Sequence, residues 1–158
     1  MVLENRFNKL IEARHGTILY NKNDIYIGKS IEKYGEFSYL EAKIFEQICK
    51  DGDVVIEVGA NIGAHTLYLS KLVGNGFVFA FEPQRLVFQN LCANLALNSI
   101  SNVFAYQEAV SNENGTIIIP ECNFKENNNF GGINIENTKN GTTVNKQKLD
   151  NFLNKINR

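Results

Sequence analysis

One segment constrains the fold more than any other: an apolar run that leads directly into a glycine-containing turn. The run is Val54-Val55-Ile56-Glu57-Val58, and the turn is Gly59-Ala60-Asn61-Ile62-Gly63. Near-continuous β-branched residues are typical of a strand that is buried on both faces of a parallel sheet. A helix is expected over residues 64–73 and a second buried strand over residues 77–81. This order of elements predicts a βαβ unit.

The same alternation continues toward the middle of the chain. Pro83 suits the first turn of a further helix, in which Phe88, Leu91 and Leu95 form the inward stripe up to about Asn98. A third strand is expected over residues 103–106. Because crossovers between parallel strands are right-handed, these elements predict an α/β fold with a doubly wound parallel sheet.

The segments before this unit predict a small extension. Residues 2–12 place Leu3, Phe7, Leu10 and Ile11 on one helical face, which favours a short amphipathic helix. Residues 17–20 and 25–27 flank a polar turn and predict a β-hairpin. Ser38 is a candidate cap for a helix to Lys50, with Leu40, Ile44 and Ile48 as its apolar stripe. We therefore divide the chain into an extension, residues 1–34, and a main domain, residues 35–158.

The C-terminal part departs from the βα pattern. Residues 115–120 predict a strand, and residues 142–144 are expected to pair with it antiparallel. The polar, asparagine- and glycine-rich segment between them, residues 121–140, predicts a mobile loop. A last helix carries Leu149, Phe152, Leu153 and Ile156 on one face. Three parallel strands make a small doubly wound sheet, so we expect the chain to represent part of a larger domain.

Composition excludes several classes of protein. Apolar residues make up 44% and charged residues 21% of the chain, which is ordinary globular usage. The net charge of −1 lacks the basic excess of proteins that bind nucleic acid. The sequence predicts neither a membrane-spanning helix nor a signal peptide. Cys49, Cys92 and Cys122 show no zinc-ligand spacing and are expected to be buried, reduced thiols. We therefore expect no metal and a cytoplasmic location.

The turn after the first strand has the chemistry of a nucleotide site. Glycines let the backbone approach a ligand closely, and the following helix N-terminus offers free N–H groups to an anionic group. Glu82 ends the second strand, where a carboxylate can accept hydrogen bonds from both hydroxyls of a ribose.

The identity of the nucleotide follows from Asn61 and Glu57. A dinucleotide fingerprint needs a glycine where Asn61 stands, and Glu57 would repel a pyrophosphate. S-adenosylmethionine has no phosphate. Its ammonium suits the carboxylate of Glu57, and its own carboxylate suits the N–H groups of the helix. The charges therefore favour S-adenosylmethionine over a nicotinamide dinucleotide.

At the level of motifs, VVIEVGANIGAHTLYLS followed by FVFAFEPQ resembles the FkbM-type family of S-adenosylmethionine-dependent methyltransferases. Asp51-Gly52-Asp53, Ala109-Val110-Ser111 and the segment Lys148–Leu153 agree further, so the resemblance covers residues 35–153. It implies a Rossmann-like class I methyltransferase fold. It also implies methyl transfer, commonly to oxygen, with sugars and natural products among the acceptors.

The resemblance also implies a set of cofactor-binding residues. These are Glu57, Gly59, Ala60, Asn61 and Gly63 in the first motif, Glu82 as the ribose-binding acid, and Glu108 and Ala109 at the adenine. The family pattern continues with a further strand that ends in an Asp-Val-Glu-Gly-type motif beside the substrate pocket. This chain ends before that motif and before the remaining strands of the seven-stranded sheet, so the resemblance assigns no acceptor-site residues.

Three functions stay open at this point. The first is an S-adenosylmethionine-dependent O-methyltransferase that acts on a small metabolite or sugar. The second is a truncated, inactive remnant that retains only the cofactor-binding half, with the variant that two copies pair through an exposed sheet edge. The third is a nicotinamide-dependent oxidoreductase, which the fold alone permits.

No residue is assigned a catalytic role. His65 lies near the motif, but a packing histidine inside the following helix is the simpler interpretation. His15 is expected at a surface turn. Glu36, Tyr39 and Glu41 suit either the rim of a pocket or a solvated helix face.

Overall fold

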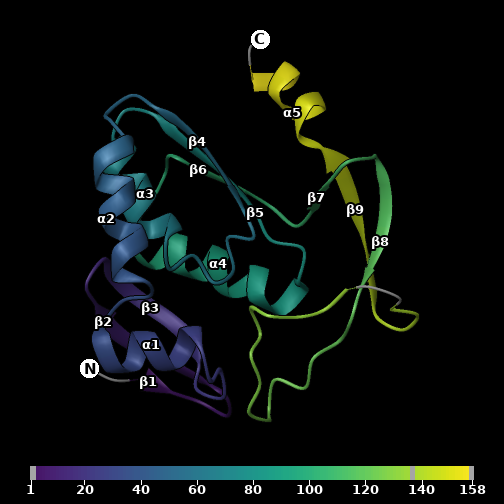
Figure 1. The fold of residues 1–158 in the computed structure, drawn as a ribbon. Helices are drawn as coiled ribbons and strands as arrows, with labels where there is room; N and C mark the ends of the chain where they lie inside the picture. The colour runs from purple at the N-terminus through teal and green to yellow at the C-terminus, as the bar shows by residue number, and fades with distance from the viewer. Residues whose placement is uncertain (1–2, 136–137, 157–158) are drawn as a thin grey trace.

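A three-stranded parallel sheet forms the centre of the molecule (Figure 1). The computed structural model describes residues 3–135 and 138–156, without the side chains of residues 154–156. The strands are β4 (Val54–Val58), β5 (Phe77–Phe81) and β6 (Val103–Tyr106), in the order β4-β5-β6. Val54 pairs with Phe77, and Val78 pairs with Val103. The predicted α/β fold with parallel strands is confirmed.

The two faces of this sheet have different neighbours. Helices α2 (Tyr39–Ile48), α3 (Thr66–Val73) and α4 (Arg85–Leu97) lie on one side (Figure 1). Alternate residues of a strand point to opposite faces. Ala80 accordingly joins the core cluster that contains residues of α3 and α4, while Phe79 and Phe81 pack with Phe152 of α5 (Leu149–Ile156).

The expectation that the first strand is buried on both faces is wrong. Val54 and Val58 of β4 are 51% and 56% exposed. Among the described residues no strand pairs with the outer edge of β4. On the second face Phe77 and Phe104 are also exposed, since α5 covers only part of that face. The apolar run correctly predicted a strand, but not which of its surfaces are covered.

The N-terminal extension folds differently from the prediction. Residues 2–12 form no helix in the part that the structure describes. They contain β1 (Leu3–Glu4) and most of β2 (Asn8–Ala13), and β2 pairs antiparallel with β3 (Gly16–Asn21). Gly16, with φ 135°, follows the tight turn that brings β3 back along β2. Pairing with β3 therefore overrides a weak helical periodicity.

The second half of the predicted hairpin is also wrong. Residue 27 begins a helix, α1 (Ile27–Tyr34), instead of belonging to a strand. The Asp24 carboxylate accepts hydrogen bonds from the backbone N–H groups of Tyr26 and Ile27, at 3.0 and 3.2 Å. These bonds satisfy N–H groups at the start of α1 that lack a partner within the helix.

Two asparagines attach the N-terminal sheet to α4. The side chains of Asn94 and Asn98 each form a pair of hydrogen bonds with the backbone of β3, at Leu19 and Thr17 respectively. The distances lie between 2.7 and 3.0 Å. The two amides thus take the place of a neighbouring strand. Ile18 and Tyr20 of β3 join the same core as Leu91 of α4.

A second small sheet follows β6. It has the order β7-β9-β8, with β7 (Ala109–Ser111) parallel and β8 (Gly115–Ile119) antiparallel to β9 (Thr142–Lys148). The antiparallel pair predicted from residues 115–120 and 142–144 is present.

Residues 121–132 are docked, contrary to the mobile loop predicted over 121–140; we call them the strap. The backbone of Asn128 bonds to Asn23 and Ile25, each at 3.0 Å, and the carbonyl of Phe124 accepts from Asn21 and Asn23. Residues 136–137 of the predicted loop lie outside the described part.

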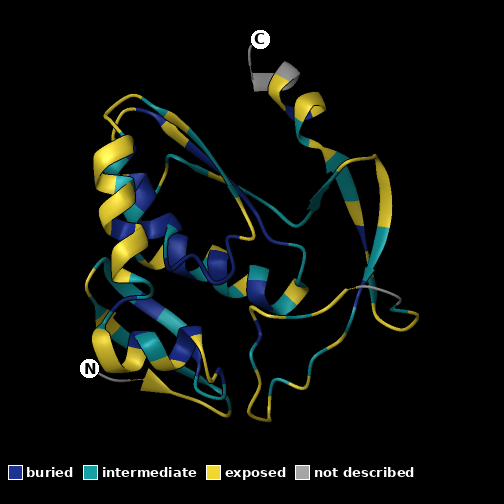
Figure 2. Ribbon diagram, in the orientation of Figure 1, coloured by how far each residue is buried: buried dark blue, intermediate teal, exposed yellow. Residues whose placement is uncertain are grey.

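Helix α2 confirms the predicted helix, but its apolar stripe faces the solvent instead of the core. Leu40, Ile44 and Ile48 are 74%, 52% and 63% exposed, whereas Ala42 is buried. Most of α2 has the colour of exposed residues in Figure 2. Ser38 occupies the cap position with φ 55° and makes no side-chain capping bond. In α5 only part of the predicted stripe is inward: Phe152 is buried, Leu153 is exposed, and the side chain of Ile156 lies outside the described residues.

The cysteines are less buried than the sequence predicts. All three cysteines are free, but Cys92 is exposed, and Cys49 and Cys122 are only partly buried. The expectation that all three are buried is therefore wrong. No helix in the described part of the chain is both long and apolar enough to cross a membrane.

Candidate functional site

The loop between β4 and α3 forms the floor of the candidate site. Gly59 and Gly63 have φ values of 76° and 86°, a region that L-residues rarely adopt. A Cβ on Gly63 would lie 2.7 Å from Leu91 of α4, whereas a Cβ on Gly59 would meet nothing within 4 Å. Gly63 is therefore needed for packing against α4. Gly59 leaves open space above the backbone, which a ligand can fill.

Glu82 joins this loop to the end of β5. Its carboxylate accepts a hydrogen bond from the backbone N–H of Asn61 at 3.0 Å and another from that of Gln84 at 2.8 Å. The side chain is only 3% exposed, and burial raises the pKa of its carboxyl group, while the two N–H bonds oppose that shift. The structure thus brings together the two motifs that are 21 residues apart in the sequence.

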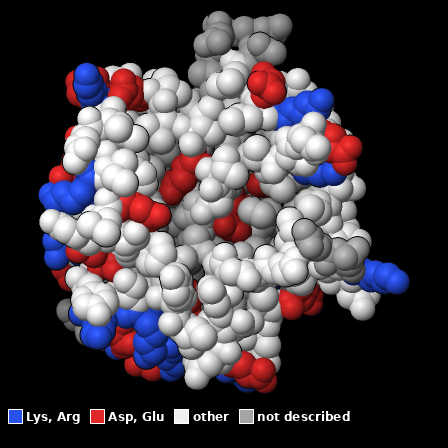
Figure 3. Space-filling view, viewed as in Figure 1, with Lys and Arg blue, Asp and Glu red and all other residues white. Residues whose placement is uncertain are grey.

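Glu57 adds a second carboxylate at the end of the neighbouring strand. It is half-buried and accepts a hydrogen bond from the hydroxyl of Thr66 at 2.7 Å. Burial raises the pKa of Glu57 to about 7, and the negative charge of Glu82 adds to the shift. Acidic side chains lie in the hollow at the centre of the face shown in Figure 3. Two nearby carboxylates favour a cationic ligand.

These residues fit S-adenosylmethionine. The open space above Gly59 admits a ligand close to the backbone, and Glu57 offers a carboxylate for an ammonium. Each oxygen of Glu82 accepts one N–H bond and keeps a second lone pair for a ribose hydroxyl. Asn61 has φ 51° and a buried side chain whose oxygen accepts a hydrogen bond from the N–H of Ile62. This side chain therefore stabilises the turn. Ala60 is buried in the core.

Glu108 and Ala109 follow the end of β6, where the backbone N–H of Glu82 donates to the carbonyl of Tyr106 at 3.0 Å. The carboxylate of Glu108 accepts a hydrogen bond from the side chain of Gln147. Glu108 also lines a cavity of about 410 Å³ among the aromatic residues of the second sheet face. Ala109 begins β7. Their assignment to the adenine stays a prediction.

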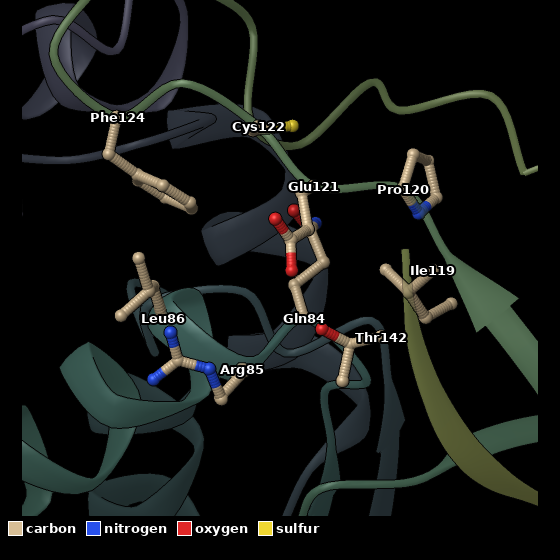
Figure 4. A pocket seen from close by; sticks show the side chains of 9 residues that line it. All are labelled: Gln84, Arg85, Leu86, Ile119, Pro120, Glu121, Cys122, Phe124 and Thr142. Carbon is tan, nitrogen blue, oxygen red and sulfur yellow. The ribbon is translucent and has the colours of Figure 1, made fainter. Parts of the chain in front are cut away.

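The strap reaches the same end of the sheet, which the sequence did not predict. The side-chain amide of Gln84 donates to the carbonyl of Phe130 at 2.8 Å, and Phe130 is 2% exposed. A cavity of about 110 Å³ lies between the strap and the start of α4. In Figure 4, Leu86 and Phe124 lie on one side of it and Ile119 and Pro120 on the other. The asparagine-rich composition of the strap does not predict such a contact.

His65 also faces the site, although we predicted a packing residue inside a helix. It directly precedes α3, which begins at Thr66 rather than at residue 64. Its ring packs against Phe37 and Phe45, as expected. It also lines a cavity of about 430 Å³ together with Glu57 and Gly59.

The other residues near the motif are structural or peripheral. His15 is not a free surface residue, because it stacks on Tyr68 at 4.0 Å and is largely buried. Glu36 is buried and pairs with Arg14 at 3.2 Å, whereas Tyr39 and Glu41 are exposed. No group of three or more potential metal ligands occurs among the described residues.

Comparison with known proteins identifies related sequences. The family described as "Methyltransferase FkbM domain" matches residues 57–158. Methyltransferase sdnD of Sordaria araneosa is 33% identical over 89 residues, which are 52% of this chain and 34% of that protein. Methyltransferase 1 of Beauveria bassiana is 27% identical over 90 residues, 53% of this chain and 36% of that protein. The matched region thus spans about a third of each of these relatives.

Solved structures share the fold. TYW2 of M. jannaschii, solved in complex with AdoMet, has a TM-score of 0.52 at 18% identity, covering 70% of this chain and 53% of its own. Trm5b of Pyrococcus abyssi has a TM-score of 0.51 at 17% identity, covering 75% of this chain and 34% of its own. At these identities the similarity concerns the fold alone.

Proposed function

Because this chain belongs to the Methyltransferase FkbM domain family, we propose that it binds S-adenosylmethionine and serves methyl transfer to an oxygen of a small acceptor. The acceptor classes that we propose are sugars and other small metabolites, including natural products. We also propose that the protein acts in the cytoplasm and uses neither nucleic acid nor a membrane as its partner.

One observation carries the proposal: Glu57 and Glu82 flank a glycine turn with open space above Gly59. A carboxylate at Glu57 attracts an ammonium, and one at Glu82 accepts ribose hydroxyls. The same pair would repel a pyrophosphate. The nicotinamide alternative is therefore disfavoured on charge.

When bound, S-adenosylmethionine would supply a methyl group attached to a positively charged sulfur, suited to in-line transfer to an acceptor oxygen with S-adenosylhomocysteine as the leaving group. The contribution of this chain is to bind and orient the cofactor, and correct positioning accounts for much of the rate of such a step. The rigid attachment of the loop to β5, through the bonds of Gly59 and Ala60 to Phe81 at 2.9 Å, suits that role.

A second candidate is a binding protein without turnover, as in a remnant of a larger enzyme. The edge of β4 favours this candidate, since among the described residues no strand lies beyond β4 to enclose an acceptor next to the site. The two candidates share cofactor binding and differ in turnover.

Isothermal titration of the purified chain with S-adenosylmethionine tests cofactor binding, the step that the two candidates share. A separate titration with NADH tests the nicotinamide alternative. We expect saturable binding of S-adenosylmethionine only, and loss of that binding in Glu82→Ala. Glu113→Ala, which removes a 66% exposed carboxylate in the turn between β7 and β8, is the matched control and should bind normally. Binding of NADH alone, or of neither ligand by a folded chain, would contradict the proposal.

Turnover is then measured as release of S-adenosylhomocysteine in the presence of hydroxylated acceptors. Acceptor-dependent release supports the enzyme, whereas binding without release from any acceptor supports the second candidate.

A further inference from the structure

His65 and Glu41 form a polar pair in the wall of the cavity that also contains Glu57 and Gly59. Nε2 of His65 lies 3.1 Å from the carbonyl oxygen of Phe37 and 3.4 Å from a carboxylate oxygen of Glu41. A carbonyl oxygen only accepts hydrogen bonds, so Nε2 carries the proton and donates. His65 thus presents an N–H to oxygen acceptors at the edge of the candidate site.

The surroundings of this pair determine which ligand group it suits. The cavity measures about 430 Å³. Its described lining is mostly apolar, and its ionisable members besides Cys49 are Glu41, Glu57 and His65. His65 is therefore the one residue of that lining that can become positively charged.

S-adenosylmethionine brings two opposite charges on its amino-acid end, an ammonium and a carboxylate. Glu57 is suited to the ammonium, and Glu57 and His65 face the same cavity. A carboxylate in a mostly apolar cavity needs a donor, since an unpaired buried charge is strongly unfavourable. The Glu41 carboxylate already shows that a carboxylate oxygen fits beside Nε2.

We propose that His65 binds the carboxylate of the cofactor, and that Glu41 occupies this position in its absence. Glu41 is 54% exposed, so its side chain can swing out into solvent when the ligand arrives. The inference rests on the proposed function and extends it, because it adds a side chain to the helix N–H groups as a partner for the cofactor carboxylate.

Two ligands separate this role from a structural one. 5′-Methylthioadenosine has the nucleoside of S-adenosylmethionine but lacks the amino-acid end. In isothermal titration we expect His65→Phe to lower the affinity for S-adenosylmethionine about tenfold or more. This change corresponds to the loss of one charge-assisted hydrogen bond. Binding of 5′-methylthioadenosine should stay the same. His65→Gln, which keeps an N–H donor without the charge, should bind with intermediate affinity.

Glu41 provides the second test. Glu41→Gln removes the competing charge and should raise the affinity for S-adenosylmethionine about threefold, which is the effect expected from losing one exposed ion pair. The affinity for 5′-methylthioadenosine should not change. If His65→Phe lowers the affinity for both ligands equally, the inference is overturned, because His65 would then only stabilise the structure of the loop.

Unchanged affinity of S-adenosylmethionine in His65→Phe would also overturn it and would leave His65 free for another role, such as a base for the acceptor. If the unaltered chain binds neither ligand, the proposed function itself fails, and the inference fails with it.

Discussion

At the scale of single residues, the site depends on carboxylates that the fold holds in an unfavourable environment. Glu82 is retained by two backbone N–H groups, and Glu57 by one hydroxyl. Both have a raised pKa because burial disfavours the charged form. Such shifts are frequent at functional sites. The chain thus holds two acidic groups whose charge a cationic ligand would stabilise.

The raised pKa of Glu57 predicts a pH dependence of stability. In the folded state the pKa is about 7, against an ordinary value of 4.5. The folded chain therefore binds more protons than the unfolded chain between these values, and stability falls as pH rises through this window. The change in the free energy of unfolding is on the order of 3 kcal/mol for this one group. Urea unfolding at several pH values should show that Glu57→Gln removes this part of the decline.

Glu126→Gln, at an exposed position of the strap, serves as the control and should keep the decline of the unaltered chain. If Glu57→Gln and the unaltered chain respond to pH in parallel, the assignment to Glu57 is wrong.

A second residue-scale prediction concerns Asn94, which is completely buried. Its amide bonds to both backbone groups of Leu19 and to the carbonyl of Ile62, at 2.7 to 3.0 Å. Asn94→Ala would leave these buried groups without partners, so we expect a loss of about 3 kcal/mol in the free energy of unfolding. Gln89→Ala, at an exposed position on the same helix, should change it by less than about 0.5 kcal/mol. Comparable urea midpoints for the two variants would contradict this role.

At the scale of elements, the strap differs most from what its composition suggests. Its polar backbone forms hydrogen bonds with the N-terminal extension and with Gln84. Phe130 stacks on Phe124 at 4.6 Å and is buried in the same core as Ile62. One buried aromatic side chain therefore anchors a segment whose composition predicts a mobile loop.

Phe130→Ala should release this element. Removing a buried phenylalanine is expected to destabilise the chain by about 3 kcal/mol or more. The amides of residues 121–132 should also exchange hydrogen faster than those of the parallel sheet. Hydrogen exchange followed by mass spectrometry measures both regions. Phe77→Ala removes a 44% exposed ring and is the control, in which strap exchange should stay slow. Unchanged protection of the strap in Phe130→Ala would refute the anchor.

At the scale of the whole molecule, apolar surface is distributed unevenly. Apolar residues at the outer edge of β4, in the stripe of α2, and at Phe77 and Phe104 of β5 and β6 are exposed. The apolar residues Leu67 of α3 and Leu91 of α4 are buried, and Figure 2 shows the buried residues concentrated around these two helices. Exposed apolar patches and open strand edges promote association. Self-association through the β4 edge therefore stays our prediction for the isolated chain.

A charge on that edge tests the prediction. Light scattering coupled to gel filtration should give a mass that increases with concentration for the unaltered chain. Val54→Lys should reduce this increase, because a lysine on an edge strand opposes strand pairing. Leu97→Lys adds the same charge at a position that is 48% exposed, close to the 51% of Val54, but on α4. It should behave like the unaltered chain. A monomer at every concentration would refute the prediction.

The sequence by itself determined the parallel sheet, the helices that follow its strands and the placement of Glu57 and Glu82 at the same end of the sheet. These features depend on signals within a few residues, namely apolar runs, glycines in turns and acids at strand ends, and on the alignment of strand ends in a parallel sheet. The tertiary structure alone decided the strands of residues 3–13, the docked strap and the exposed stripe of α2. It also placed His65 beside the site. These features depend on which distant segment supplies a partner, and a local pattern records that a residue is apolar but not what covers it.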